Sequence, residues 1–429
     1  MHKVVIIGGG FAGINLALDL AGDKAIEVTL VDKNNYNFFA PLLYQVSTGM
    51  LDVASISTPF RTLFKGKKNL TFRIGELKSI DEAAKQVILD TGKLTYDYLV
   101  LATGTTSNYF GNESIEKKSL PMKTIEESIQ LRNTLLSVAE LATITKDEDE
   151  KEKLRNIVIT GGGPAGVEVA GMLAELRNKA LQKIYPEINK DLLRIYLIEG
   201  GESLLGGMRK KSQDYAKKSL NKLGVIVMLE TKVDDFKDNN VILNNGDKIP
   251  TKTLIWTAGV KAYKFEGLPE SFYKQANRIE VDEFNRLKGH NSIFAIGDTC
   301  IQKHDNRYKE GFPQLGSVAT QQGKQLAKNF KRLFQNKALK PFKFVDKGTM
   351  AIIGKSKATA DMEIPKKTLT GWVAWAAWLG VHLFLLINYR NKIKTMWQWT
   401  TSYLTKTEPD ALMIGRSKLT ARANNDSNQ

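Results

Sequence analysis

Short apolar runs that end in glycine organise the first half of the chain. Val4 to Ile7 is such a run, and its length is typical of a buried parallel strand. Glycines follow it directly, Ile14 to Leu20 is typical of a helix, and a second apolar run, Val28 to Val31, ends at Asp32. The pattern predicts a strand, a glycine turn, a helix and a second parallel strand.

The same order returns near the middle of the chain. Ile157 to Thr160 leads into glycines and a helix, and the next strand, Arg194 to Ile198, ends at Glu199. The interval from the first glycine to the acid is 14 residues longer than in the first copy. This additional length predicts an extended helix and loop over 176–192.

Each copy continues with a similar hairpin and a strand that ends in small residues. Residues 87–92 resemble 241–246, and residues 99–104 resemble 254–259. The doubled order predicts an α/β fold with two Rossmann-like dinucleotide-binding domains.

The glycines of the two turns have the spacing G-x-G-x-x-G. They are Gly8, Gly10 and Gly13 in the first copy, and Gly161, Gly163 and Gly166 in the second. Glycine at these positions lets the backbone and a helix N-terminus approach a pyrophosphate, and the acid after the next strand bonds a ribose 2′-hydroxyl. Two such sites on one chain indicate hydride or electron transfer between two dinucleotides.

Composition narrows the chemistry. The 429 residues carry a formal net charge of +16, which is typical of proteins that bind nucleic acid, anionic membranes or anionic cofactors, and no nucleic-acid motif is present. The single cysteine, Cys300, excludes an intrachain disulfide and is predicted to be a small buried residue. The four histidines are scattered, so no metal site is predicted. The charged segment 146–153 predicts a solvated loop.

The C-terminal region has a different composition. Five of the six tryptophans lie after residue 370. Residues 371–387 hold one polar side chain, His382, and as a helix would be about 26 Å long against a hydrocarbon core of about 30 Å. Regularly spaced tryptophans and basic residues at both ends favour a helix at the membrane interface. Ile393, Met396 and Trp397 begin an amphipathic helix, so the region is predicted to be a monotopic anchor; a core or homodimer interface is the alternative.

The sequence resembles the type II NADH:quinone oxidoreductases, which are flavoproteins with two dinucleotide-binding domains. The segments that carry the resemblance are 38–46, 163–168, 319–323 and 348–354, together with the tryptophan-rich end. The likeness extends to about Ile414. Related disulfide reductases and sulfide:quinone oxidoreductases need redox cysteines. The single cysteine of this chain, Cys300, which follows Gly297 and Asp298 closely, does not supply them.

The resemblance implies non-covalent FAD in the first domain and NADH, as a substrate, in the second. The implied FAD-binding residues are Gly8, Gly10, Phe11, Ala12, Gly13, Asp32, Lys33, Ala102, Thr103, Gly104 and Asp298. The implied NADH-binding residues are Gly161, Gly163, Pro164, Ala165, Gly166, Glu199, Ala258 and Gly259. Asp298 is the last residue of a segment in which a strand ends in Gly-Asp. Taken alone, this segment is equally typical of an ordinary turn. After two glycine loops it resembles a flavin fingerprint in which the Asp side chain bonds the ribityl chain.

Glu168 and Gln321 are the implied catalytic residues. In the family the carboxylate lies near nicotinamide and flavin and hands on protons or reports cofactor occupancy, although an early-helix acid is also typical of a favourable helix-dipole interaction. The implied quinone-site candidates are Pro41, Tyr44, Ser317, Gln321 and Gln322, and Ser317 departs from the Gln or Pro usual there.

The choice between NADH and NADPH depends on Glu199. A carboxylate there bonds a 2′-hydroxyl and repels a 2′-phosphate, which favours NADH. Arg209, Lys210 and Lys211 follow within a dozen residues and keep the phosphate alternative open.

The resemblance implies a membrane-associated enzyme that passes a hydride from NADH to FAD and then two electrons to a quinone, ubiquinone or menaquinone, without pumping ions. Its expected partners are the lipid surface and a second copy in a homodimer. No signal-peptide pattern is visible, which predicts a location on the cytoplasmic face of the membrane. Two alternatives stay open: an NADH reductase of a soluble acceptor such as ferredoxin or rubredoxin, and a slow nucleotide-sensing flavoprotein.

The expected domain division follows the repeat. Residues 1–115 and 281–345 are predicted to form the FAD-binding domain, and 116–280 the NADH-binding domain. Residues 346–415 are the predicted anchoring region, and 416–429 a polar tail.

Overall fold

A computed structural model describes residues 1–404, 412 and 413 of the chain. The chain divides into two compact units. Unit 1 comprises residues 1–38, 57–106 and 260–346, and unit 2 comprises 39–56, 107–259 and the residues from 347 onward. The predicted polar tail, 416–429, lies outside the described residues.

Unit 1 is built on a parallel five-stranded sheet. Its strand order is β21 (Ile293–Ala295), β9 (Tyr98–Leu101), β1 (His2–Ile7), β2 (Ile26–Asp32) and β5 (Leu70–Ile74). Alternate residues of β1 enter two different cores, because Val4 and Ile6 belong to one buried cluster and Val5 and Ile7 to another. A strand buried on both faces reads as a continuous apolar run, which is the pattern seen in the sequence.

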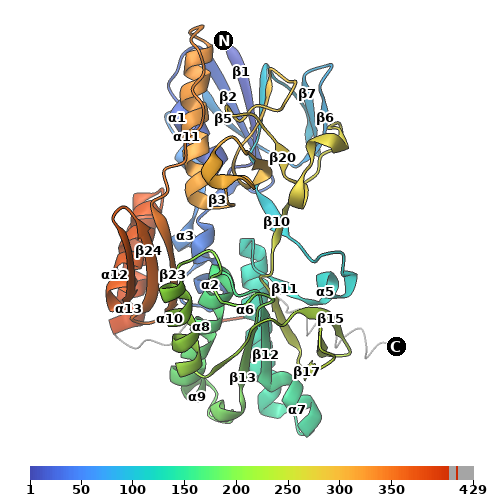
Figure 1. Cartoon of the computed structure of the whole chain (residues 1–429), viewed down its shortest axis with the longest axis vertical. Coiled ribbons are helices and arrows are strands. Elements are labelled where there is room, and N and C mark those ends of the chain that lie inside the picture. Colours follow the sequence, from blue (N-terminus) through green and yellow to red (C-terminus); the bar gives the residue numbers. More distant parts are fainter. Residues whose placement is uncertain (405–411, 414–429) are drawn as a thin grey trace. The chain divides into compact units, whose positions relative to one another are not determined.

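Helices α1 (Phe11–Leu20) and α11 (Gly316–Leu333) lie side by side against this sheet (Figure 1). They approach closely at Gly323, where a Cβ would lie 2.3 Å from the carbonyl oxygen of Ala12. The remaining elements of unit 1 include an antiparallel sheet of β6 (Leu77–Asp81), β7 (Gln86–Leu89) and β8 (Gly92–Thr95), the pairs β3 (Tyr36–Phe38) with β4 (Ser57–Pro59) and β20 (Ile279–Glu280) with β22 (Cys300–Ile301), and helix α4 (Phe60–Leu63).

Unit 2 repeats the architecture. Its parallel sheet has the order β11 (Leu120–Pro121), β18 (Thr253–Trp256), β12 (Asn156–Thr160), β13 (Arg194–Ile198) and β14 (Val225–Met228). The antiparallel sheet of β15 (Val233–Lys237), β16 (Asn240–Leu243) and β17 (Lys248–Pro250) is the counterpart of β6 to β8. The predicted α/β fold with two Rossmann-like sheets is therefore confirmed.

The helices of unit 2 include one that forms where the sequence analysis predicted a loop. They are α2 (Leu43–Ser47), α3 (Val53–Ile56), α5 (Glu113–Lys118), α6 (Ile125–Ile144), α7 (Glu148–Arg155), α8 (Pro164–Lys179), α9 (Leu181–Ile184) and α10 (Lys210–Lys222). The loop predicted over 146–153 was wrong, because α7 forms there. Asp147 caps it by accepting from Glu150 N, three acids occupy its first turn, and Lys153 and Arg155 stand in its last. That charge order stabilises the ends of a helix.

The C-terminal part of unit 2 consists of a small sheet and two helices. The sheet contains β23 (Gly348–Gly354), β24 (Lys357–Glu363) and β25 (Lys366–Gly371), and it leads into α12 (Trp372–Leu385) and α13 (Tyr389–Leu404). Among the described residues, none of the helices has the length and apolar character that a membrane crossing requires.

Candidate functional site

The first glycine loop connects β1 to α1 and leaves space only beside the helix N-terminus. Gly8 has φ +104°, and a Cβ there would lie 2.4 Å from the carbonyl oxygen of Ala102, just after β9. A Cβ at Gly13 would lie 1.9 Å from the carbonyl oxygen of Gly8. A Cβ at Gly10 would meet no described atom within 4 Å, and no side chain caps α1 there. This open position at an uncapped helix N-terminus fits a bound pyrophosphate.

Asp32 closes the same loop from the end of β2. Its Oδ2 accepts from the backbone N of Gly9 at 2.7 Å and its Oδ1 from that of Asn34 at 2.8 Å. Burial raises the pKa of this carboxyl, and its two backbone hydrogen bonds oppose the rise. Lys33 is exposed beside it.

The second loop, between β12 and α8, has the same geometry. Gly161 has φ +106°, and a Cβ at Gly166 would again lie 1.9 Å from the carbonyl oxygen of the first glycine. Gly163 has no described atom within 4 Å of a Cβ position, and Pro164 starts the helix without a side-chain cap. Glu199 Oε2 accepts from Gly162 N at 2.5 Å, as Asp32 does from Gly9.

The basic residues after Glu199 are engaged elsewhere. The Arg209 backbone N donates to Asp361 Oδ2 at 2.6 Å, and its guanidinium forms an ion pair with Glu363 at 2.5 Å. Lys210 pairs with Asp214 at 2.8 Å. Two of the three cations that could serve a 2′-phosphate thus form ion pairs with carboxylates.

Thr299, which the sequence analysis did not single out, joins the predicted flavin turn to the end of β9. Its hydroxyl oxygen accepts from Gly104 N at 2.9 Å and lies 3.3 Å from Thr103 Oγ1. Phe11 and Ala12 form the first turn of α1 close to these elements, since a Cβ at Gly297 would lie 3.1 Å from that of Ala12.

Gln322 is buried under the Gly297-Asp298 turn. Its Oε1 accepts from Gly297 N at 2.7 Å, and its Nε2 donates to Gln302 Oε1 at 3.2 Å. The carbonyl oxygen of Asp298 accepts from Gln314 at 3.3 Å. The side chain predicted as a quinone candidate therefore positions the turn. Cys300 beside it is buried as predicted, and burial raises the pKa of its thiol to about 12.

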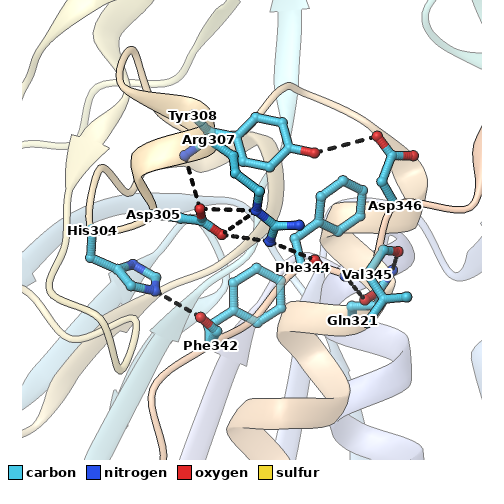
Figure 2. A network of polar contacts seen from close by, with 9 residues as sticks. All are labelled: His304, Asp305, Arg307, Tyr308, Gln321, Phe342, Phe344, Val345 and Asp346. Carbon is cyan, nitrogen blue, oxygen red and sulfur yellow. Dashed lines mark hydrogen bonds and ion pairs between the residues drawn. The ribbon is translucent and has the colours of Figure 1, made fainter. Parts of the chain in front are cut away.

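Gln321 holds the segment after α11 in place (Figure 2). Its Nε2 donates to Val345 O and its Oε1 accepts from Val345 N, both at 3.0 Å. The same segment is fixed by His304, which meets Phe342 O at 2.7 Å. Both polar ends of the Gln321 amide are thus engaged with backbone, and Ser317, one turn earlier, is exposed.

Glu168 lies in the second turn of α8 and is 9% exposed. Among the described residues its hydrogen bond comes from Ile352 N at 3.5 Å, which is long. Burial raises the pKa of this carboxyl to about 8. A carboxyl with this pKa is protonated at neutral pH and is able to give up a proton.

Tyr44 lies near Glu168 in the same unit, since the charge of that carboxylate helps burial to raise the tyrosine pKa. Gln45 donates its Nε2 to Tyr44 OH at 2.7 Å and accepts from Trp399 Nε1 at 2.7 Å. This chain of hydrogen bonds joins α2 to α13. Pro41 is half-buried just before α2. The sequence motif contained Gln45, but its partner lies 354 residues away.

Helices α12 and α13 each bury one face and expose large apolar side chains on another. Trp378 and His382 are buried and stacked with ring centroids 3.8 Å apart, so His382 is a packed residue, and burial lowers its pKa to about 4. Thr395 and Trp399 are buried on α13. The exposed set, here called the apolar patch, consists of Trp372, Phe384, Leu385, Ile387, Tyr389, Ile393, Met396 and Trp397.

Two family models match successive parts of the chain. Residues 2–323 match the family model described as pyridine nucleotide-disulphide oxidoreductase, and residues 347–406 match the NDH2 C-terminal domain. The chain is 32% identical over 420 residues to the type II NADH:quinone oxidoreductase NdhA of Mycobacterium tuberculosis, covering 94% of this chain and 87% of that protein. It is 31% identical to Ndh of the same organism, covering 94% and 88%.

The fold has a close counterpart among solved structures. NDH2 from Plasmodium falciparum, in complex with NADH, aligns with a TM-score of 0.87 and 22% identity over 96% of this chain and 99% of that one. The sulfide:quinone oxidoreductase of Aquifex aeolicus aligns with a TM-score of 0.72 and 21% identity, covering 95% and 96%.

Proposed function

The chain belongs to the type II NADH:quinone oxidoreductases, and we propose which of its residues carry each part of that reaction. The enzyme oxidises NADH and reduces a quinone, and FAD is its cofactor. The observation that carries the assignment of residues is the doubled glycine loop, with the same backbone geometry in each unit and an acid that accepts from the backbone N of the residue after the first glycine, Gly9 or Gly162. When bound, the flavin accepts a hydride and passes its electrons on.

The first loop is proposed to hold FAD. Gly10 and the N-terminus of α1 would face the pyrophosphate, and Asp32 would bond the ribose. The hydrogen bonds that Thr299 and Gln322 accept hold the Gly297-Asp298 turn in position at the end of the sheet. These polar side chains do no redox chemistry themselves, and their task is to fix the cofactor.

The second loop is proposed to bind NADH. Gly163 and Pro164 would face the pyrophosphate, Glu199 the adenosine ribose, and Ala258 and Gly259, after β18, the remainder of the cofactor. Glu199 together with the ion-paired Arg209 and Lys210 supports NADH over NADPH.

Turnover with NADPH is expected to be at least about 100-fold less efficient than with NADH, because Glu199 repels a 2′-phosphate at close range. The test is steady-state oxidation of each nucleotide by flavin-loaded protein in lipid, with a short-chain quinone. Glu199→Gln should narrow the ratio, whereas Glu202→Gln, an exposed acid in the same loop, should leave it unchanged.

Two outcomes would redirect this proposal. Equal efficiency with both nucleotides would remove Glu199 from the adenosine site. Rapid flavin reduction by NADH without quinone turnover would point to a protein acceptor of the ferredoxin or rubredoxin type.

Glu168 and Tyr44 are proposed to serve the quinone side of the reaction. A quinone that takes up two electrons also takes up two protons, and the protonated Glu168 carboxyl is a suitable source of one of them. Gln45 orients the Tyr44 hydroxyl, and Trp399 orients Gln45. Gln321 of unit 1 and Pro41 of unit 2 each stay candidates for contact with the quinone. Whether the quinone is ubiquinone or menaquinone does not enter this argument.

The apolar patch is proposed to lie on the cytoplasmic surface of the membrane, where NADH is available. Eight large apolar side chains on α12, α13 and the segment between these helices, with Arg390 and Lys392 beside them, have the composition of an interfacial anchor. The same face would also suit a homodimer, which vesicle binding distinguishes from a lipid contact.

Replacing Phe384 and Trp397 together by serine should lower binding to anionic vesicles about 100-fold. These side chains are 76% and 68% exposed, and burying each is worth about 1.5 kcal/mol or more. Cosedimentation with vesicles measures the change. Ile144→Ser is the matched control, because Ile144 is 72% exposed and belongs to α6, not to the helices of the patch. Unchanged vesicle binding together with a loss of dimers would assign the patch to the homodimer.

A further inference from the structure

Unit 2 contains an apolar cavity apart from both glycine loops. Its volume is about 140 Å³. The walls come from α6, α8, α9 and the ends of α2 and α7. Leucine, isoleucine and alanine side chains form most of the lining, among them Leu136, Ala139, Leu173, Leu176, Leu181 and Ile184.

Arg132 lies in this cavity wall and has no partner there. It is 5% exposed, and no described residue forms a hydrogen bond or ion pair with its guanidinium, whose Nε is buried and unpaired. A buried cation without a counter-charge is strongly destabilising, because its hydration is lost without compensation. The arrangement therefore indicates an anionic group that is supplied from outside the described residues.

The other two arginines of the lining differ in this respect. Arg155 forms an ion pair with Glu148 at 3.4 Å. Arg177 donates to the backbone carbonyls of Leu193, Leu223 and Gly224. Their positive groups are engaged, so Arg132 is the cation of the lining that is left for a ligand.

Polar and apolar residues both line the cavity. Ser47 and Thr48 of the α2 segment line it together with Arg132. Along α6 the lining continues from Arg132 to Ala142, ten residues further, which corresponds to about 15 Å at 1.5 Å per residue. Leu136, Ala139 and Ala142 are half-buried, so the apolar wall of α6 is accessible.

We propose that this cavity binds a single-chain amphiphile with a carboxylate head, a long-chain fatty acid. The carboxylate would pair with the Arg132 guanidinium in a charge-assisted, bidentate contact. The first part of the hydrocarbon chain would fill the cavity, and the remainder would lie along the accessible wall of α6 toward Ala142, because a volume of about 140 Å³ does not enclose a whole long chain. A quinone has a chain of the same kind but no negative charge, so it does not satisfy Arg132. The proposal is independent of the roles assigned above to Glu168 and Glu199.

The test uses the full-length, flavin-loaded protein after removal of bound lipid. Isothermal titration calorimetry with dodecanoate, below its micelle concentration, and with dodecanol in parallel measures the contribution of the charge. Dodecanoate is expected to bind at least about 10-fold more tightly than dodecanol, since hydrogen bonds to charged groups are the stronger kind.

Arg132→Met removes the charge and keeps the length of the side chain. It should weaken dodecanoate binding about 10- to 100-fold and leave dodecanol binding unchanged. It should also raise the midpoint of thermal unfolding of the lipid-free protein, because the unpaired buried cation is gone. Arg155→Met is the matched control and should retain the preference for dodecanoate. Flavin content reports that each variant is folded.

Three outcomes would overturn the proposal. Equal affinity of the wild-type protein for dodecanoate and dodecanol would show that the protein does not recognise the negative charge of the carboxylate. An Arg132→Met variant with wild-type dodecanoate binding would place the ligand elsewhere. No binding at all, combined with destabilisation by Arg132→Met and equally by Glu408→Gln/Asp410→Asn, would assign Arg132 to an acid of the chain itself.

Discussion

Gly13→Ala is expected to yield protein without bound flavin, and Gly166→Ala protein that keeps its flavin but is no longer reduced by NADH. In each case the added Cβ would lie 1.9 Å from the carbonyl oxygen of the first glycine of the loop, a separation that no side chain adopts. The loop must open, and the helix N-terminus then loses its place beside the pyrophosphate. We expect at least about a 100-fold loss of affinity, which corresponds to roughly 3 kcal/mol of strain.

The two variants test whether the first loop binds FAD and the second loop binds NADH. Absorbance of the purified protein measures flavin content, and anaerobic mixing with NADH measures flavin reduction. Gly380→Ala is the control, because a Cβ there would meet no described atom within 4 Å. If Gly166→Ala also loses flavin, the loops are not independent; if Gly13→Ala keeps it, the first loop is not the flavin site.

Local patterns account for most of what the sequence predicted. Each copy of the nucleotide-binding pattern spans no more than about 40 residues, from the apolar run of β1 or β12 through the glycines to the acid after the next strand. The residues that fix the loop conformation therefore all lie within that span. Gly8 and Gly161 require positive φ values, which glycine adopts without strain, so the loop conformation is visible in residue types alone.

The charged segment before β12 shows where local composition misled. High charge indicated a solvated loop, yet the order of the charges mattered more than their number. Asp147 and the acids of the first turn stabilise the N-terminus of α7, and Lys153 forms an ion pair with Glu150 at 2.6 Å. A capping residue followed by acids and then bases predicts a helix.

Contacts between distant segments could not be predicted. Trp399 bonds Gln45 across 354 residues, and the α6 residue Arg132 lines a cavity with the α2 and α9 segments. Nothing near Arg132 in the sequence shows that its guanidinium is buried without a partner. Gln322 likewise fits an amphipathic helix pattern, and its contact with the Gly297 turn follows only from tertiary packing.

Stability should reveal the unusual carboxyl of Glu168 before any kinetics are measured. Its folded-state pKa is about 8, against 4.5 for the ordinary group, so the folded protein binds one more proton than the unfolded chain between these pH values. The contribution of this group to the free energy of unfolding is fully present below pH 4.5 and is lost as pH rises to about 8. The slope is at most about 1.4 kcal/mol per pH unit.

Glu168→Gln removes the titrating group, so its unfolding free energy should fall less steeply than that of wild type between pH 5 and 8. Chemical denaturation at several pH values measures the difference. Glu175→Gln is the matched control on the same helix, because Glu175 is also buried but accepts from Lys355 N at 2.9 Å and pairs with Lys179 at 3.1 Å. It should retain the wild-type pH dependence.

Glu168→Gln should also lower quinone-dependent turnover about 100-fold, the usual contribution of a positioned proton donor, while flavin reduction by NADH stays fast. Wild-type turnover should decline above pH 8, where the carboxyl loses its proton, and the variant should show no such decline. Stopped-flow reduction separates the two half-reactions, and turnover across pH 6 to 9 gives the profile. A variant with wild-type turnover at every pH would exclude Glu168 as the proton donor, and the carboxyl would then serve only to pack α8 against β23.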